Sequence, residues 1–153
     1  MGKEIERKYL VAGTAWRELA RGVRYRQGYL STVKERTVRV RTVGDRGYLT
    51  VKGVTVGATR HEFEYEIPAN DAAALLELCE QPLVEKIRYA IPFGGLTWEV
   101  DEFEGANRGL LVAECELSSE DQRIELPPWV GQEVTGDPRY FNSNLIAHPF
   151  SKW

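Results

Sequence analysis

The stretch "KEIERKYLV", Lys3–Val11, lies near the start of the chain and alternates charged with mostly apolar side chains. Glu4, Glu6 and Lys8 fall on one parity of this stretch. Because successive side chains of a β-strand point to opposite faces of the sheet, the alternation predicts a strand with one apolar and one charged face. The question it raises is whether the charged face meets water or a ligand.

Seven further segments alternate in the same way, and glycine-bearing turns separate several of them. Hairpin turns are expected at Val43–Gly47 and Pro92–Gly95, where glycine supplies the positive φ angles that tight turns need. The pattern predicts a mainly β fold of the α+β type, mostly antiparallel, that closes into a barrel. The eight expected strands are Glu4–Val11, Arg24–Ser31, Arg36–Val43, Arg46–Gly53, Arg60–Ile67, Val84–Ile91, Leu96–Phe103 and Leu110–Ser118.

Three segments favour helix and are expected to cover the outside of this barrel. The first is Ala15–Arg21, and the second is the alanine- and leucine-rich stretch at residues 70–80. The third begins with Asp137 as N-cap and Pro138 at the first helical position, and it should end before Pro149.

Composition narrows the class of protein. The 153 residues carry a formal net charge of -3, which argues against a general nucleic-acid binder. No window approaches the ~18 apolar residues of a membrane helix, and the charged N-terminus lacks the apolar part of a secretory signal. The two cysteines have no CxxC spacing, so neither a disulfide framework nor a zinc site is expected. We therefore expect a single domain over residues 1–153, cytoplasmic, with no membrane partner.

Charges of one sign recur two residues apart on several strands. For any one strand, a solvated face is the simpler interpretation, because an antiparallel sheet with one wet face alternates in the same way. Like charges at neighbouring same-face positions repel, however, whereas clustered carboxylates suit divalent cations and clustered basic groups suit phosphates. We therefore expect the charged faces to line the barrel and the apolar faces to pack outward against the helices. The runs are Glu4/Glu6, Arg39/Arg41, Glu62/Glu64/Glu66, Lys86/Arg88 and Glu114/Glu116.

The motif EIERKYL, Glu4–Leu10, resembles the ExExK signature of the CYTH domain, the family of triphosphate tunnel metalloenzymes. Further matching motifs follow in order along almost the whole chain. The resemblance implies an eight-stranded antiparallel tunnel that binds a triphosphate together with Mg²⁺ or Mn²⁺. The further motifs are RVR at Arg39–Arg41, TVK at Thr50–Lys52, RHEFEYEI at Arg60–Ile67, EKIRY at Glu85–Tyr89, WEVDEF at Trp98–Phe103, AECEL at Ala113–Leu117 and DPRYFN at Asp137–Asn142.

The resemblance assigns a role to each kind of charge. Independently of the resemblance, Lys86 and Tyr29 are expected to act as a catalytic pair that handles a proton, because a neighbouring cation lowers the pKa of a tyrosine. Tyr29 packing in the core is the alternative. The implied metal ligands are Glu4, Glu6, Glu64, Asp101, Glu114 and Glu116. The implied phosphate contacts are Lys8, Arg39, Arg41, Lys52, Lys86, Arg88 and Arg139.

The implied activity is metal-dependent hydrolysis of inorganic triphosphate to diphosphate and phosphate. Water should attack the phosphate directly, because no cysteine or serine lies in a sequence context typical of a catalytic nucleophile. Alternatives in the family are nucleoside or thiamine triphosphatase and class IV adenylate cyclase; outside it stands a non-catalytic polyphosphate-binding module. The expected partner is a small-molecule triphosphate, and the expected assembly is a monomer or homodimer.

Overall fold

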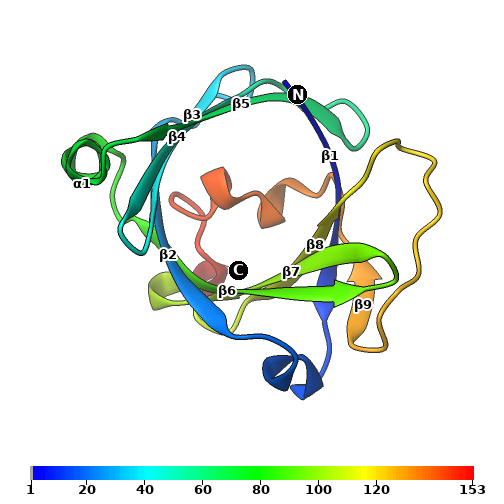
Figure 1. Ribbon diagram of the computed structural model, residues 1–153. Helices are drawn as coiled ribbons and strands as arrows, with labels where there is room; N and C mark the ends of the chain where they lie inside the picture. The colour runs from blue at the N-terminus through cyan, green and yellow to red at the C-terminus, as the bar shows by residue number, and fades with distance from the viewer. Residues whose placement is uncertain (1) are drawn as a thin grey trace.

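A computed structural model describes residues 2–153, and over these residues it contains nine β-strands and one α-helix. The strands form one antiparallel sheet in the order β5-β4-β3-β2-β6-β7-β8-β1-β9, and pairing of β5 with β1 closes eight of them into a barrel (Figure 1). The predicted antiparallel barrel is confirmed. The elements are β1 (Lys3–Val11), β2 (Gly22–Ser31), β3 (Thr37–Val43), β4 (Arg46–Lys52), β5 (Thr59–Ile67), α1 (Ala69–Leu78), β6 (Val84–Phe93), β7 (Leu96–Phe103), β8 (Leu111–Glu116) and β9 (Val130–Glu133).

The pairing register keeps the charged faces of neighbouring strands together. Glu6 of β1 lies opposite Glu116 of β8, and Lys8 lies opposite Glu114. Residues directly opposite in an antiparallel pair share a face, so the charged parity of each strand continues on the next. The charged faces line the interior, as predicted.

The apolar parity packs outside the wall formed by β1, β7 and β8. Trp98 is fully buried there, with its ring centroid 5.6 Å from that of Tyr9 and 6.2 Å from that of Trp129. Trp16, on a single 3₁₀ turn at Ala15–Glu18, completes the cluster. The predicted helix at Ala15–Arg21 is therefore wrong, and this apolar face is covered by a turn and by the segment that leads into β9.

Helix α1 covers a second, smaller apolar patch, over β3 and β4. Its Ala72 and Leu76 pack against Val40 and Leu49. Gly47 permits this approach, because a Cβ at that position would lie only 2.5 Å from the Cβ of Ala72. No helix within the described part of the chain is long and apolar enough to cross a membrane.

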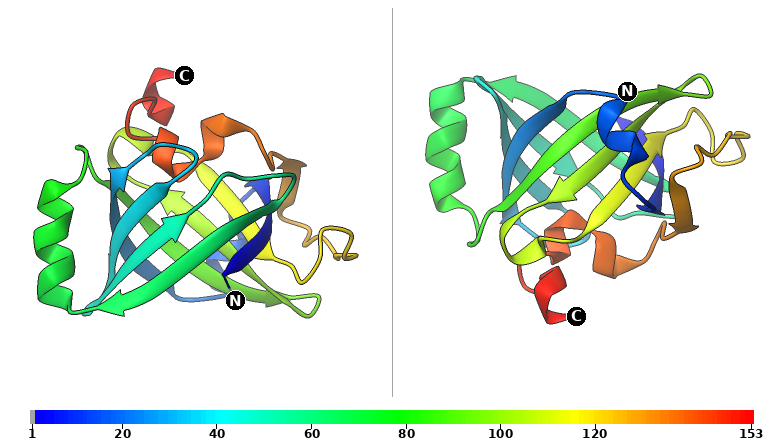
Figure 2. Two further views of the ribbon diagram at one scale, coloured as in Figure 1. Left: turned by 90° about the horizontal axis from the view of Figure 1, so that it is seen from above. Right: turned by 90° about the horizontal axis from the view of Figure 1, so that it is seen from below.

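The C-terminal segment crosses one end of the barrel instead of covering its side (Figure 2). Asp137 accepts a hydrogen bond from the backbone N–H of Arg139, as an N-cap does, but the turn ends after Tyr140. Two further 3₁₀ turns follow, so the predicted helix up to Pro149 is wrong. The physical reason is local: Asn144 donates its side-chain amide to a backbone carbonyl, and short polar side chains of this kind compete with helical hydrogen bonds.

The same segment brings an apolar cluster to that end of the barrel. Tyr140 and Leu145 pack there against Val84, Phe103 and Val112. These three strand residues have the parity of the charged face, so the inner wall changes from charged to apolar where the segment closes it.

Strand β9 was not predicted from the sequence, because its four residues VGQE lack an alternating pattern. It pairs with the second half of β1, beyond the point where β5 leaves that edge. Arg7 binds Glu133 through two hydrogen bonds of 2.7 and 3.0 Å, which fixes β9 to β1 from the outside.

Candidate active site inside the barrel

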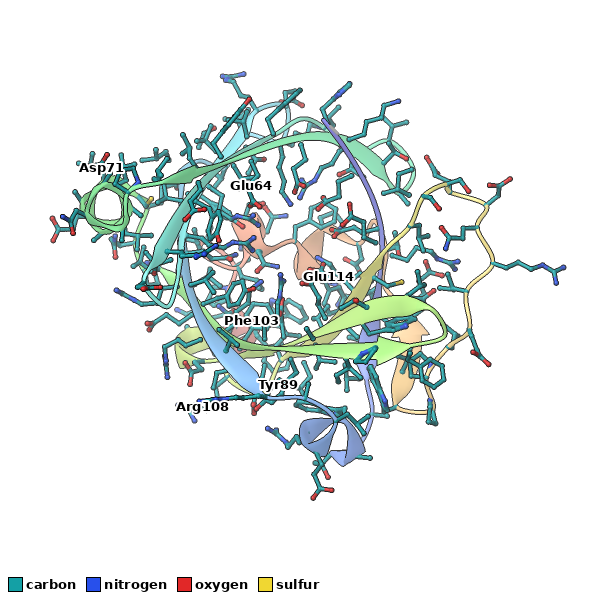
Figure 3. All side chains as sticks on the ribbon, in the orientation of Figure 1. Glu64, Asp71, Tyr89, Phe103, Arg108 and Glu114 are labelled. Carbon is teal, nitrogen blue, oxygen red and sulfur yellow. The ribbon has the colours of Figure 1, made fainter. Side chains whose placement is uncertain are left out.

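The barrel encloses a cavity of about 230 Å³ whose walls are mostly charged or polar. Figure 3 shows the side chains of Glu64 and Glu114 directed into the barrel from different walls. The cavity thus collects side chains that lie far apart in the sequence. The predicted site residues that line it are Glu4, Glu6, Lys8, Tyr29, Arg39, Arg41, Lys52, Glu64, Lys86, Arg88, Glu114 and Glu116.

Two predicted site residues lie elsewhere. Arg139 is exposed on the C-terminal segment, where its guanidinium donates to Asp137 at 2.9 Å and stacks over the rings of Tyr140 and Trp153. Asp101 is buried and does not line the cavity, and protein donors occupy both of its oxygens.

Asp101 is the shared counter-ion of the two basic side chains of β6. Its Oδ2 accepts from Lys86 Nζ at 2.7 Å and from Arg88 Nη2 at 2.9 Å, and its Oδ1 accepts from Arg88 Nε at 2.7 Å. Burial acts to raise the pKa of this carboxyl, but the two cations outweigh burial and hold the pKa well below its usual range. Asp101 is therefore an anion that fixes Lys86 and Arg88 in place.

The amine of Lys86 is almost completely removed from water. Burial lowers its pKa to about 7, although the carboxylate of Asp101 acts in the opposite direction. Its Nζ also donates to Asn142 Oδ1 at 3.0 Å, and the same oxygen accepts from Gln27 Nε2 at 2.9 Å. Gln27 Nε2 lies 3.3 Å from the hydroxyl of Tyr29, to which it donates. Two amide side chains thus connect Lys86 with Tyr29.

Tyr29 faces the cavity and is only 3% exposed. Burial raises its pKa, and this effect outweighs the cations Arg39, Arg60 and Arg41, which act to lower it. The expected net lowering of the Tyr29 pKa by a neighbouring cation is therefore wrong: cations do act in that direction, but the cost of burying a phenolate dominates. At neutral pH Tyr29 offers a hydroxyl group.

Two arginines of β3 converge on one carboxylate of β5. Glu64 Oε1 accepts from Arg39 Nη2 at 3.3 Å, from Arg41 Nη2 at 3.2 Å and from Thr50 Oγ1 at 2.8 Å. Burial acts to raise the pKa of Glu64, but Arg41, Thr50 and Arg39 lower it overall, so the group is ionised.

A second group of ion pairs lies where β1 meets β5. Glu4 Oε1 accepts from Lys52 Nζ at 3.3 Å and from Arg60 Nε at 3.4 Å. Lys52 also lies 3.1 Å from Glu62. Burial acts to raise the pKa of Glu4, but these partners lower it to about 2.

Glu6 and Glu116 differ from the other carboxylates of the cavity. They lie opposite each other on β1 and β8, and neither forms an ion pair within 4 Å with any residue in the range 2–153. Burial, together with Glu114 and Glu4, raises the pKa of Glu6 to about 8, and burial also raises the pKa of Glu116. Over the described residues, no three acidic, histidine or cysteine side chains are arranged to hold a metal ion.

Sequence reasoning did not select several lining residues. Arg60, Glu62 and Glu99 share the charged parity of their strands, so the alternation could have included them. Asn142 and Ser143 lie on the irregular C-terminal segment, where no periodic pattern indicates which side chains face inward.

Comparison with known proteins gives consistent matches. Residues 2–148 match the model of the CYTH domain family. An inorganic triphosphatase of Acetivibrio thermocellus is 55% identical, and the alignment covers 100% of this chain and 99% of the relative. An inorganic triphosphatase of Nitrosomonas europaea is 41% identical, with 93% and 95% covered. The crystal structure of the inorganic triphosphatase NE1496 superimposes with a TM-score of 0.67 at 35% identity, covering 93% of this chain and 96% of that one.

Proposed function

The chain belongs to the CYTH domain family, and on that premise we propose that it hydrolyses inorganic triphosphate to diphosphate and phosphate, using a divalent cation. The observation that carries the proposal is the division of charge inside the barrel. Two cavity carboxylates, the half-buried Glu6 and the more exposed Glu116, have no ion-pair partner among the described residues, and they share the cavity with a cluster of arginines and lysines. A metal-bound triphosphate needs both kinds of group.

The carboxylates of β1 and β8 fit a divalent cation. Mg²⁺ and Mn²⁺ prefer oxygen ligands, and Mg²⁺ is usually held by one or two carboxylates, water and substrate phosphates. Glu6 and Glu116 supply such a pair, with Glu4 and Glu114 beside them. Carboxylates at facing positions repel each other, and a bound cation would offset that repulsion. Bound there, Mg²⁺ or Mn²⁺ would neutralise phosphate oxygens and polarise the phosphorus centre.

The arginines of β3 suit the phosphate chain. Guanidinium groups bind phosphate oxygens through two parallel hydrogen bonds, which fixes orientation as well as charge. The Nε atoms of Arg39 and Arg41 are buried and have no hydrogen-bond partner among residues 2–153. These two donors are thus unsatisfied within the described protein, and Lys8, Lys52 and Arg88 border the same cavity.

We further propose Lys86 as the group that accepts the proton of the attacking water. A general base works best when its pKa lies near the operating pH, and burial lowers the pKa of Lys86 to about 7. Asp101 and Asn142 hold its Nζ in position. The hydroxyl of Tyr29 would orient the water or a phosphate oxygen by hydrogen bonding instead of taking up the proton.

The cavity offers little to recognise a nucleoside. Its aromatic lining residues, over the described chain, are Tyr29 and Phe141. Gln27 donates to the hydroxyl of Tyr29, and the amine of Lys8 lies 5.8 Å from the ring centroid of Phe141. Binding free energy should therefore come from the phosphate chain and its cation, which favours inorganic triphosphate over ATP or thiamine triphosphate.

Phosphate release from triphosphate, ATP, thiamine triphosphate and diphosphate tests this function, with Mg²⁺, Mn²⁺ or EDTA present. We expect kcat/KM for triphosphate to exceed that for ATP at least about tenfold, or roughly 1.4 kcal/mol in transition-state binding. Diphosphate should react poorly, and EDTA should abolish activity. Glu116→Gln protein purified in parallel controls for contaminating phosphatases. Equal or faster hydrolysis of ATP, or formation of cyclic AMP, would instead favour a nucleotide enzyme.

A further inference from the structure

Glu64 occupies the point at which the two arginines of β3 converge. Three donors, from Arg39, Arg41 and Thr50, meet on a single carboxylate oxygen at 2.8 to 3.3 Å. Convergence of two guanidinium groups and a hydroxyl on one oxygen is the arrangement that binds an anion. The side chain of Glu64 is 36% exposed, against 10% and 13% for the arginines, so the carboxylate lies on the more accessible side of the contact.

The position of Glu64 argues against a role as metal ligand. Its strand meets β1 at Arg60, which lies opposite Glu4, and Glu64 follows four residues later. Four residues of extended strand span about 13 Å. Glu64 therefore lies far along the barrel wall from the carboxylates of β1, and its Oε1 is already occupied by the arginines.

We propose that Glu64 is an internal competitor that occupies the phosphate-binding arginines until a substrate phosphate displaces it. The inference rests on the proposed triphosphatase function and deepens it. A phosphate oxygen must take the place of the carboxylate, because the Nη2 atoms of Arg39 and Arg41 both donate to Glu64. A phosphate with more than one negative charge gains more from two guanidinium groups than a carboxylate does. The exchange thus favours substrates whose terminal phosphate is highly charged. It also helps to release the diphosphate product, because Glu64 can bind the arginines again.

Removing the charge of Glu64 should strengthen anion binding. In Glu64→Gln the amide keeps the shape of the side chain but cannot balance the two arginines. The affinity for a phosphate anion should rise about fivefold at low salt. The gain should shrink at high salt, because screening weakens electrostatic attraction at a partly exposed site.

Glu66→Gln is the matched control. Glu66 lies on the same strand and the same face two residues further on, and its carboxylate is 3.9 Å from Arg46 instead of the arginines of β3. Both substitutions remove one negative charge from β5, so a general change in field would appear in both variants. Only Glu64→Gln removes the negative charge that balances Arg39 and Arg41.

Calorimetric titration of inorganic diphosphate into metal-free protein in EDTA tests the inference. We expect Glu64→Gln to lower the Kd about fivefold, Glu66→Gln to change it less than about twofold, and Glu64→Ala to repeat the effect of Glu64→Gln. In steady-state assays the KM for triphosphate should fall by a similar factor, while the Mg²⁺ concentration for half-maximal activity stays unchanged.

Equal or weaker diphosphate binding by both Glu64 variants would overturn the inference. A raised Mg²⁺ requirement in Glu64→Gln would also overturn it and return Glu64 to the metal ligands. Failure of the proposed function would look different, because the wild-type protein would then neither hydrolyse triphosphate nor bind diphosphate.

Discussion

Asp101→Asn removes one negative charge from a buried cluster and leaves two cations without their shared counter-ion. Asp101 is 3% exposed and Lys86 is 2% exposed, so water cannot replace the lost carboxylate. Arg88 keeps a hydrogen bond of 3.0 Å to Glu114, whereas Lys86 keeps Asn142 and gains at best one amide oxygen. The substitution therefore tests whether Asp101 contributes to the stability of the folded barrel.

The structure allows an estimate of the effect. Breaking a buried ion pair by removal of one partner costs about 3–5 kcal/mol. Lys86 can relieve part of this cost by releasing its proton, because its pKa is already lowered to about 7 and loss of Asp101 would lower it further. We expect the free energy of unfolding to fall by about 3 kcal/mol near neutral pH. For a chain of this size, that corresponds to a decrease in Tm of about 6–12 °C.

Thermal unfolding of the metal-free protein in EDTA, followed by calorimetry, measures this decrease. EDTA removes any contribution of a bound cation, so the assay reports the protein alone. If Asp101 served mainly as one of several crowded metal ligands, its neutralisation would relieve repulsion and leave Tm unchanged or higher. A Tm of Asp101→Asn at or above that of the wild type would refute the reasoning.

Three further outcomes follow from the other charged groups. Glu116→Gln should leave the metal-free Tm unchanged or higher, yet lower kcat/KM at least about 100-fold, since losing even a partner of a metal ligand costs about 10–100-fold. Glu4→Gln should lower that Tm, because its carboxylate binds two basic side chains. In pH–rate profiles, kcat/KM should rise through about pH 7 as Lys86 loses its proton; Lys86→Arg should abolish that rise and Tyr29→Phe should retain it.

The charged interior could be predicted because a strand has a period of two. Once Glu6 and Lys8 share a face, the pairing of β1 with β8 must place them beside side chains of the matching parity, which are Glu116 and Glu114. The same logic holds around the barrel, so the sequence alone indicates which face of each strand is directed into the barrel. The hairpin glycines Gly44 and Gly94 were likewise predictable, and both have a φ angle of 59°.

The alternation of the sequence could not distinguish the roles of two residues on the same face of one strand. Glu99 and Asp101 share one face of β7, and the sequence treats them alike. Only the register shows that Asp101 lies opposite Arg88 while Glu99 lies opposite Glu114. Asp101 therefore becomes a buried counter-ion, and Glu99 lines the cavity. The contribution of Asn142 was also hidden, because the C-terminal segment has no repeating backbone pattern.

The charged side chains inside the barrel fall into two groups. Some form ion pairs that stabilise the barrel, and others have no ion-pair partner among the described residues and can bind a ligand. Asp101 and Glu4 each contact two basic side chains, so their charges are balanced within the protein. Glu6 and Glu116 have no such balance over the described residues, and burial raises the pKa of both. Folding alone gives no reason to place two uncompensated carboxylates opposite each other, because like charges at facing positions of a sheet are destabilising. The unpaired Glu6 and Glu116 are therefore better evidence for a ligand than the ExExK motif is. That motif contains Glu6 but also Glu4, whose charge is already balanced within the protein.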